Sequence, residues 1–200
     1  MSAILMIGVI AIIVIVALNM GKGTKAEDGD FVLRAIAGDN DVALVLEKIK
    51  SEQKGKVIIP KGVTTIGYEV FKGMIYITDV TIHEKVKIIG QRSFKDCLGL
   101  DFLYTGEGTE RIGDESFEGC LNLKVITIGP RTKNIDPNAF KNCSNIAKIN
   151  IECLTPPDIF ENCFDEDVKK NCILYVPKGC LEIYSRAIGW SKFNNIQENE

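Results

Sequence analysis

Histidine and tryptophan are the scarcest residues of this chain, with one of each among 200 residues, His83 and Trp190. A single imidazole leaves little basis for histidine-dependent acid–base catalysis or for a zinc site, because zinc sites usually combine several His and Cys ligands. The seven cysteines include no Cys-x-x-Cys pair, which removes the spacing of a zinc ribbon. The sequence therefore predicts a protein that is not an enzyme, with no catalytic residue, no cofactor and no metal ion.

An excess of positive charge is also missing. Lysine and arginine total 24 against 27 aspartates and glutamates, so the formal net charge is −3, and both signs are dispersed along the chain. Proteins that bind nucleic acids usually carry a basic patch or stripe. We therefore expect no nucleic-acid partner.

The N-terminal segment lacks charged side chains altogether. From Ala3 to Leu18 the chain is almost entirely Ile, Val, Leu, Ala and Met, and no charged side chain precedes Gly21. Such a run approaches the length that crosses a hydrocarbon core of about 30 Å. A cleavable signal peptide normally adds a basic start and a small-residue cleavage site, and both are weak here. We expect residues 1–20 to be a membrane anchor, contacting the membrane through residues 3–20, with an export signal as the alternative. Either one implies a membrane-anchored or secreted protein, and we expect it at the cell surface.

A polar, glycine-rich segment follows over residues 21–30, which predicts a flexible linker. The next apolar side chains keep the i, i+3, i+4, i+7 spacing of one helix face: Val42, Val45, Leu46 and Ile49. An amphipathic helix over residues 41–54 would shield the apolar end of a repeat array, as terminal capping units do. We predict an N-terminal cap over residues 31–56 built on this helix, with a short strand at 31–33.

Between Val57 and about Ile151 the same residue types recur every 23 residues. Each repeat carries one isoleucine, one phenylalanine, one sulfur-bearing residue and two aliphatic residues: Ile66, Ile89, Ile112 and Ile135; Phe71, Phe94, Phe117 and Phe140; Met74, Cys97, Cys120 and Cys143; Ile77, Leu100, Leu123 and Ile146; Val80, Leu103, Ile126 and Ile149. Self-similarity at a period of 20–50 residues indicates a solenoid. Residues 57–152 therefore form four repeats.

Each repeat reads as a strand, a turn, a second short strand and a single helical turn. Stacked strands lie about 4.8 Å apart, so each recurring residue type becomes a continuous column inside the stack. The predicted fold class is α/β, mostly β, a solenoid of short strands and single helical turns. Residues 153–200 form an irregular last repeat and a C-terminal cap: Leu174–Val176 is its strand, 181–188 its helix, and Trp190, Phe193 and Ile196 seal the stack.

The repeat pattern Val57-x-Ile59-Pro60, then Val63-x-x-Ile66-Gly67-x-x-x-Phe71, with a cysteine three residues after the phenylalanine in later copies, resembles the BspA-type leucine-rich repeats. The closing segment from Leu174 to Ile196 looks like the C-terminal end of that family, so the resemblance covers about residues 57–197. It implies a curved right-handed solenoid and adhesion or protein binding rather than catalysis. Such repeats are common in surface and secreted proteins of host-associated anaerobic bacteria and occur in some protists. The resemblance supplies no fixed set of binding residues.

The cysteines fall into two groups. Cys97, Cys120 and Cys143 share one column, and we expect them to be buried free thiols that act as small apolar side chains. Cys153, Cys163, Cys172 and Cys180 lie in the closing segment, where four cysteines permit three pairings that the sequence does not choose between. Export from the cell would permit a disulfide among these four.

Outward-facing strand positions are where a binding function should show. Because side chains alternate along a strand, Phe102 and Tyr104 should project away from buried Leu103. Together with flanking residues of the adjacent coils they form the predicted partner-binding surface: Thr81, His83, Phe102, Tyr104, Val125 and Thr127. We predict a non-catalytic, adhesion-type module that binds another protein. The alternative is a structural spacer or assembly subunit without a separate ligand.

Overall fold

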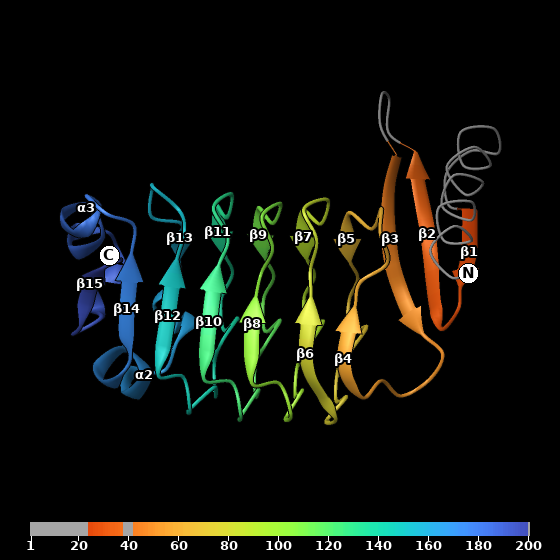
Figure 1. Ribbon diagram of the computed structural model, residues 1–200, viewed down its shortest axis with the longest axis horizontal. Coiled ribbons are helices and arrows are strands. Elements are labelled where there is room, and N and C mark those ends of the chain that lie inside the picture. The colour runs from red at the N-terminus through yellow and green to blue at the C-terminus, as the bar shows by residue number, and fades with distance from the viewer. Residues whose placement is uncertain (1–23, 38–41, 200) are drawn as a thin grey trace.

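The computed structural model describes residues 24–37 and 42–199 and shows a solenoid of stacked coils (Figure 1). The predictions for residues 1–20, a membrane anchor or an export signal, lie outside the described residues. Within the part of the chain that is described, no helix is long and apolar enough to cross a membrane.

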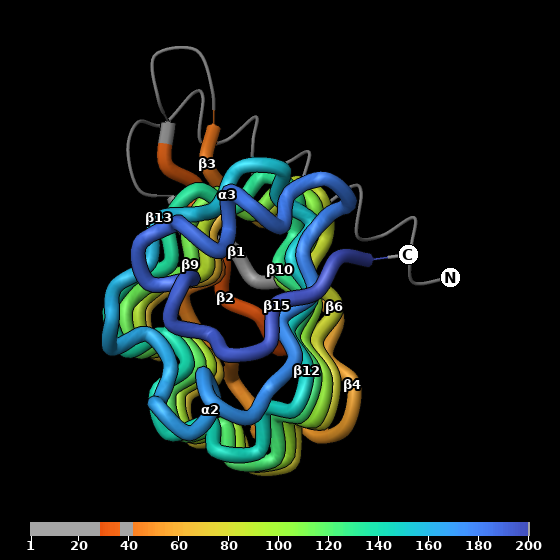
Figure 2. The backbone as a smooth tube through the Cα atoms, turned by 90° about the vertical axis from the view of Figure 1, so that its left-hand side faces the viewer, coloured from red at the N-terminus to blue at the C-terminus, as the bar shows by residue number. Residues whose placement is uncertain are grey.

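The described chain winds through two sheets that face each other across one core (Figure 2). In spatial order the first sheet contains β1 (Thr24–Asp28), β2 (Phe31–Ala37), β3 (Val42–Ile49), β5 (Thr65–Ile66), β7 (Ile88–Ile89), β9 (Arg111–Ile112), β11 (Asn134–Ile135) and β13 (Asp158–Ile159). The second contains β15 (Ile196–Glu198), β14 (Ile173–Val176), β12 (Lys148–Ile151), β10 (Val125–Ile128), β8 (Phe102–Tyr104), β6 (Ile77–Thr81) and β4 (Gly55–Ile58). We call the second the seven-stranded sheet.

Strand pairing follows the 23-residue period. In the seven-stranded sheet Val125 of β10 lies between Phe102 of β8 and Lys148 of β12, each 23 residues away, and the pairing is parallel. The opposite sheet keeps the same step, with Ile112 between Ile89 and Ile135. The predicted class, a mostly β solenoid of short strands, is confirmed. The predicted single helical turns of the regular coils are instead non-helical turns, each with a residue at positive φ, such as Glu69, Arg92 and Glu115.

The predicted capping helix over residues 41–54 is wrong. Residues Val42–Ile49 form β3, which pairs antiparallel with β2 and parallel with β5. Its burial alternates at Leu44 and Leu46, the pattern of a strand. The helical spacing was a coincidence, because Val and Ile favour strands and the edge of β5 offers backbone partners that a helix would leave unused. Thr64 reinforces this edge by exchanging hydrogen bonds with the backbone of Leu44.

The predicted linker over residues 21–30 also differs from the structure. Thr24–Asp28 form β1, an antiparallel strand beside β2. The short strand predicted at Phe31–Leu33 is present and longer, since β2 continues to Ala37. The N-terminal cap is therefore a three-stranded antiparallel extension of one sheet, and no element of the described cap is helical.

A stack of phenylalanine rings runs through the core. Phe71, Phe94, Phe117, Phe140 and Phe164 lie ring on ring, with adjacent centroids 4.7, 5.2, 5.3 and 5.0 Å apart and nearly parallel planes. Phe164 follows Phe140 by 24 residues instead of 23, yet it joins the stack. The irregular last repeat thus keeps the interior column of the regular ones.

All seven cysteines are buried free thiols. In the regular coils each thiol donates a hydrogen bond to the phenylalanine carbonyl of the preceding coil: Cys97 to Phe71 at 3.2 Å, Cys120 to Phe94 at 3.2 Å and Cys143 to Phe117 at 3.0 Å. Burial raises the pKa of the Cys97 thiol to about 12. The prediction of buried thiols in this column is confirmed, and the four cysteines of the closing segment form no disulfide.

The C-terminal cap combines four short helical segments with the last two strands. They are η1 (Glu161–Cys163), α2 (Glu166–Asn171), α3 (Leu181–Arg186) and η2 (Trp190–Lys192). Trp190 donates its indole N–H to the Pro157 carbonyl at 2.7 Å, and the Tyr184 hydroxyl donates to the Cys153 carbonyl at 2.8 Å. Trp190 and Phe193 are buried, as predicted for residues that seal the stack.

Candidate functional site

The outer surface of the seven-stranded sheet carries the predicted partner-binding residues. Side chains that alternate with the buried column point away from the core and line up across β4, β6, β8, β10, β12 and β14 in two files. We call this surface the strand face: Lys56, Asp79, Phe102, Val125, Lys148 and Ile173 in one file, and Ile58, Thr81, Tyr104, Thr127, Asn150 and Tyr175 in the other.

Phe102 lies near the centre of the strand face. It is paired in register with Asp79 on one side and Val125 on the other, and 44% of the residue is exposed. Leu103, the next residue, is fully buried, so the predicted direction of the two side chains is correct. A large exposed ring between a carboxylate and an aliphatic side chain gives this surface an apolar centre.

Tyr104 stands beside Phe102 and is half-buried. Its hydroxyl donates a hydrogen bond to the Glu152 carboxylate at 3.3 Å, which holds the ring along the sheet. Burial, together with the negative charge of Glu152, raises the pKa of Tyr104 to about 12. The phenol therefore stays protonated at neutral pH and remains a hydrogen-bond donor at the edge of an apolar patch.

Val125 and Thr127 continue the surface on the next coil. Val125 lies beside Phe102 and Thr127 beside Tyr104, so these four predicted residues form one contiguous block. Asn150 donates a hydrogen bond to the Thr127 hydroxyl at 3.1 Å. This adds a polar side chain from the next coil to the edge of the block. Thr81 is exposed at the end of β6, next to Ile58 of β4.

His83 is less available than the sequence suggested. Its Nε2 lies 2.8 Å from the Pro60 carbonyl, which can only accept, so this nitrogen carries the proton. Its Nδ1 accepts from the backbone N–H of Lys85 at 3.3 Å. Both ring nitrogens thus bind the backbone of turns beyond β4 and β6, and His83 positions the end of the strand face instead of presenting a free group.

Sequence reasoning missed two parts of the strand face. Ile58 is 63% exposed on β4, and its place between buried Val57 and Ile59 would have revealed it by simple alternation. Tyr175 of β14 lies under the Lys148 ammonium, 4.4 Å from the ring centroid, a cation–π contact that needs the stacking of two coils. The glycine-rich turn at 106–108 does not cover Phe102, whose ring remains exposed.

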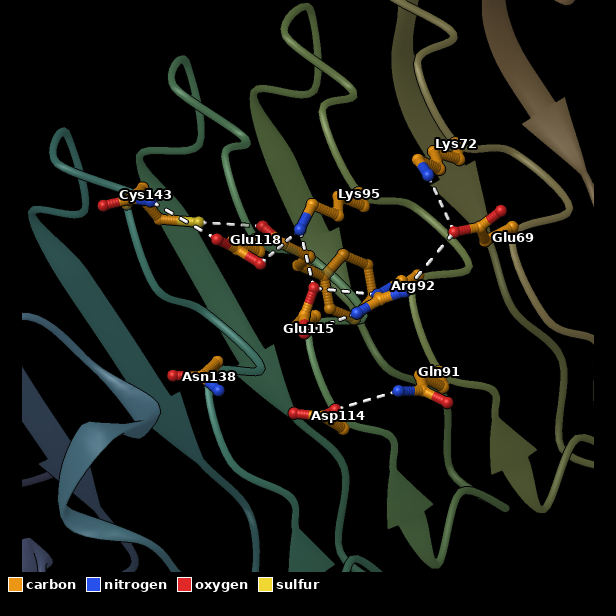
Figure 3. A network of polar contacts seen from close by, with 12 residues as sticks. Glu69, Lys72, Gln91, Arg92, Lys95, Asp114, Glu115, Glu118, Asn138 and Cys143 are labelled. Carbon is orange, nitrogen blue, oxygen red and sulfur yellow. Dashed lines mark hydrogen bonds and ion pairs between the residues drawn. The ribbon is translucent and has the colours of Figure 1, made fainter.

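A second surface, on the turns that follow β5, β7 and β9, is built from charge. Figure 3 shows its side chains reaching from coil to coil; we call them the ion ladder: Glu69, Lys72, Arg92, Lys95, Glu115 and Glu118. Arg92 binds both oxygens of Glu115, through Nε at 2.8 Å and Nη2 at 2.9 Å. Lys95 bridges Glu115 at 2.6 Å and Glu118 at 2.7 Å.

These contacts determine the charge state of Glu115. Hydrogen bonds from Arg92 and Lys95 lower the pKa of the Glu115 carboxyl to about 2, and the same contact with Glu115 raises the pKa of Arg92. The strong, saturated pairing leaves this surface with few free polar groups. It is therefore suited to holding adjacent coils together and less suited to recognition.

Hollows also occur on the described surface. One of about 470 Å³ lies between the turns after β10 and β12 and is lined by Arg131, Lys133, Glu152 and Cys153, among others. Burial raises the pKa of the Cys153 thiol to about 11, so it is a poor nucleophile at neutral pH. No group of three or more His, Cys, Asp and Glu side chains suited to a metal ion occurs among the described residues.

Comparison with known proteins identifies the repeats. The family model of the BspA type leucine rich repeat region matches residues 50–171 and 93–198, with 6 copies. The chain belongs to the BspA-type leucine-rich repeat family. The resemblance inferred from the Ile, Phe and Cys columns is thereby confirmed, and repeats of this family are typically non-catalytic.

Two solved structures have a similar fold. A leucine rich cell surface protein from Faecalibacterium prausnitzii is 21% identical with a TM-score of 0.54, and the match covers 86% of this chain and 40% of that one. The pneumococcal vaccine antigen PcpA is 14% identical with a TM-score of 0.51, with 88% and 49% covered. The chain thus spans less than half the length of either protein. No curated protein sequence matches it.

Proposed function

We propose that this BspA-type chain is a non-catalytic, adhesion-type module that holds another protein on its strand face. The observation that carries the proposal is the block of Phe102, Tyr104, Val125 and Thr127, which is contiguous and partly apolar, with Phe102 exposed and the other three half-buried. Protein-binding surfaces combine an apolar, aromatic-rich centre with a polar rim. Here Asp79, Lys148 and Glu152 supply that rim.

A parallel sheet whose strands are held on both sides suits such a role, because its side chains can be covered without rearrangement of the backbone. The strands beneath Phe102 and Tyr104 are fixed on both sides by parallel neighbours, and their inward residues belong to the fully buried core. Side chains presented on a rigid sheet lose little conformational freedom when a partner covers them. Tyr104 would lose the least conformational freedom, because its hydroxyl is already held by Glu152.

The proposal includes a place at the cell surface, with residues 3–20 as a membrane tether or an export signal. Its support is the uncharged run itself and the surface-protein description of the Faecalibacterium structure. Fractionation of cells that express the full chain tests it. The chain should sediment with membranes through alkaline carbonate washing, or be released to the medium; recovery with the soluble intracellular proteins would refute this part.

Affinity capture tests the binding face. The full chain in mild non-ionic detergent is immobilised and exposed to host and bacterial surface extracts. Phe102→Ser with Tyr104→Ser should abolish capture of a specific protein. The matched control is Leu121→Ser, because Leu121, in the turn that precedes β10, is 45% exposed, close to the 44% of Phe102. Equal loss in both variants, or no loss in the first, would refute the strand face and favour a structural spacer.

A further inference from the structure

Charge is distributed in order across the strand face, whose strands lie side by side in Figure 1. In stacking order, one file contains Lys56, Asp79, Phe102, Val125, Lys148 and Ile173. Its apolar centre, Phe102 and Val125, thus has a carboxylate one coil before it and an ammonium one coil after it. Asp101 and Lys124, which are exposed and precede β8 and β10, show the same order. Next to the centre, the negative charges therefore lie on the side of β6 and the positive charges on the side of β12.

The charged residues beside the centre are available to a second molecule. Lys148 forms no ion pair within the described part of the chain, and its ammonium lies over the Tyr175 ring. The Asp79 carboxylate lies 3.5 Å from the Lys56 ammonium, and both side chains are in contact with solvent. Because exposed ion pairs contribute little to stability, Asp79 can exchange this partner for another.

The surface that fits this file is the same file in reversed order. A two-fold axis that runs parallel to the strands, between β8 and β10, produces this reversal in a second copy that faces the first. Phe102 then lies opposite Val125 of the second copy, and Asp79 lies opposite its Lys148. Because the axis is two-fold, each of these contacts occurs twice.

The second file satisfies the same rotation. Tyr104 would lie opposite Thr127, and Thr81 opposite Asn150, so that hydroxyl and amide groups able to exchange hydrogen bonds meet. Two sheets that pack face to face lie about 10 Å apart, with their strands within about 30° of each other. At that separation the opposed side chains are in contact.

No like charges meet across the two files. Lys56, the remaining charged residue, would lie opposite Ile173, and Ile58, which is exposed, would lie opposite Tyr175. The rotation therefore opposes unlike charges and covers apolar side chains across all six strands. A partner of uniform charge would attract one half of this face and repel the other, which favours a second copy over such a partner.

We propose that the strand face binds the strand face of a second copy of this chain about this two-fold axis, with Phe102 and Tyr104 covered at its centre. The inference rests on the proposed function of the strand face and names its partner. Adhesion is then homophilic, since each chain holds another of the same kind.

Cross-linking of two mixed variants tests the pairing in the full chain, in mild non-ionic detergent. All seven native cysteines are buried, so a cysteine introduced on the strand face is the accessible thiol. Thr81→Cys in one chain should face Asn150→Cys in a second, differently tagged chain, and a short bis-maleimide should join the two as a heterodimer. Either variant alone should cross-link only weakly, because the axis separates its two cysteines by about three coils, or about 14 Å along the stack. Ser51→Cys, exposed in the loop before β4, mixed with Asn150→Cys measures chance cross-links.

Charge reversal then separates this interface from any other association. With both cysteine chains carrying Asp79→Lys alone, or Lys148→Asp alone, like charges face each other and the cross-linked fraction should fall about tenfold. The double swap, Asp79→Lys with Lys148→Asp in both chains, should restore it. Thermal melts of all variants should remain close together, because Asp79 and Lys148 make no buried ion pair within the chain.

Three results would overturn the inference. The mixture of Thr81→Cys and Asn150→Cys could cross-link no better than the mixture with Ser51→Cys. The single reversals could leave cross-linking unchanged, which would assign the association to another surface, such as the apolar N-terminal run. The double swap could fail to restore what each single reversal removes, which would mean that a reversed strand face is not the partner.

Failure of the proposed function looks different. Capture of an unlike protein that requires Phe102 and Tyr104, without cross-linking between copies, would overturn the second-copy partner and leave the proposed function standing. If Phe102→Ser with Tyr104→Ser also leaves capture unchanged, both fail.

Discussion

The strand face and the ion ladder lie on the same coils and follow the same 23-residue step, yet neighbouring side chains relate differently on each. On the ion ladder, Arg92 and Glu115 are 23 residues apart and bind each other bidentately. On the strand face, Phe102 and Val125 are also 23 apart but carry no polar group that could pair. A period in sequence can therefore serve cohesion between coils on one surface and leave the apolar centre of the other free for recognition.

The backbone explains why charge gathers at the turns that carry the ion ladder. Glu69, Arg92 and Glu115 occupy the same turn position in successive coils, and each adopts a positive φ, between 52° and 55°. Non-glycine residues rarely adopt this conformation, so the same sharp bend recurs in each coil. The recurring bend brings each long side chain next to the corresponding one on the neighbouring coil, where opposite charges can meet.

The largest expected contrast lies between an interior ring and an exposed one. Phe117→Ala should lower the free energy of unfolding by about 3–5 kcal/mol, because it leaves a cavity between the rings of Phe94 and Phe140. Phe102→Ala should change it by no more than about 1 kcal/mol, as at surface positions. Urea melts of both variants provide the comparison. Similar losses for the two rings would mean that the inward and outward register is wrong.

An intermediate effect is expected on the ion ladder. Glu115→Gln should cost about 1–3 kcal/mol at pH 7, since it removes the charge that Arg92 and Lys95 share. Denaturant melts measure this loss. Asp114→Asn is the control on the adjacent residue, because Asp114 accepts a single exposed hydrogen bond from Gln91, and should cost less than about 0.5 kcal/mol.

The same variant should alter the dependence of stability on pH. The pKa of Glu115 is lowered in the folded chain to about 2, against about 4.3 in an unfolded chain. Its contribution is therefore complete above about pH 5 and disappears as the pH falls toward 2. The difference between wild type and Glu115→Gln should narrow over this interval. A difference that stays constant down to pH 2 would show that the carboxylate charge is not what stabilises the ladder.

The smallest stability effect is expected where the functional effect is largest. Phe102→Ser with Tyr104→Ser should shift the unfolding free energy by about 1 kcal/mol or less, although the Tyr104 hydrogen bond to Glu152 is lost. Circular dichroism and a thermal melt check this. If the double variant unfolds at a much lower temperature, both rings belong to the core and the strand face is misassigned.

Much of the fold could be predicted because the interior columns keep the residue type from coil to coil. The Phe column needs one ring per coil, and the Cys column needs a small apolar side chain that can donate to the Phe carbonyl. Such identities are visible in a single sequence. The N-terminal cap could not be predicted in this way, because the apolar spacing of Val42–Ile49 also fits a helix. The segment forms a strand because the edge of β5 offers it backbone hydrogen bonds.

The candidate site was predictable in part for the same reason. Alternation about Leu103 located Phe102 and Tyr104, and the period added Val125 and Thr127. The hydrogen bonds between the His83 ring and the backbone of Pro60 and Lys85 depend on turn geometry, which the recurring residue types do not indicate. The ion ladder has a sequence trace in the alternating signs of Glu69, Arg92 and Glu115, but recognising it requires knowing that residues 23 apart are in contact.

Comparison of the two exposed apolar positions most directly tests the claim that recognition lies on the strand face and cohesion elsewhere. The measurement is the binding of one captured partner to three immobilised full-length chains: wild type, Phe102→Ser with Tyr104→Ser, and Leu121→Ser. The account predicts wild-type affinity for Leu121→Ser and a loss of at least about tenfold for the strand-face variant, with melting temperatures that remain close together. Wild-type affinity in the strand-face variant, or its loss in Leu121→Ser, would contradict the account.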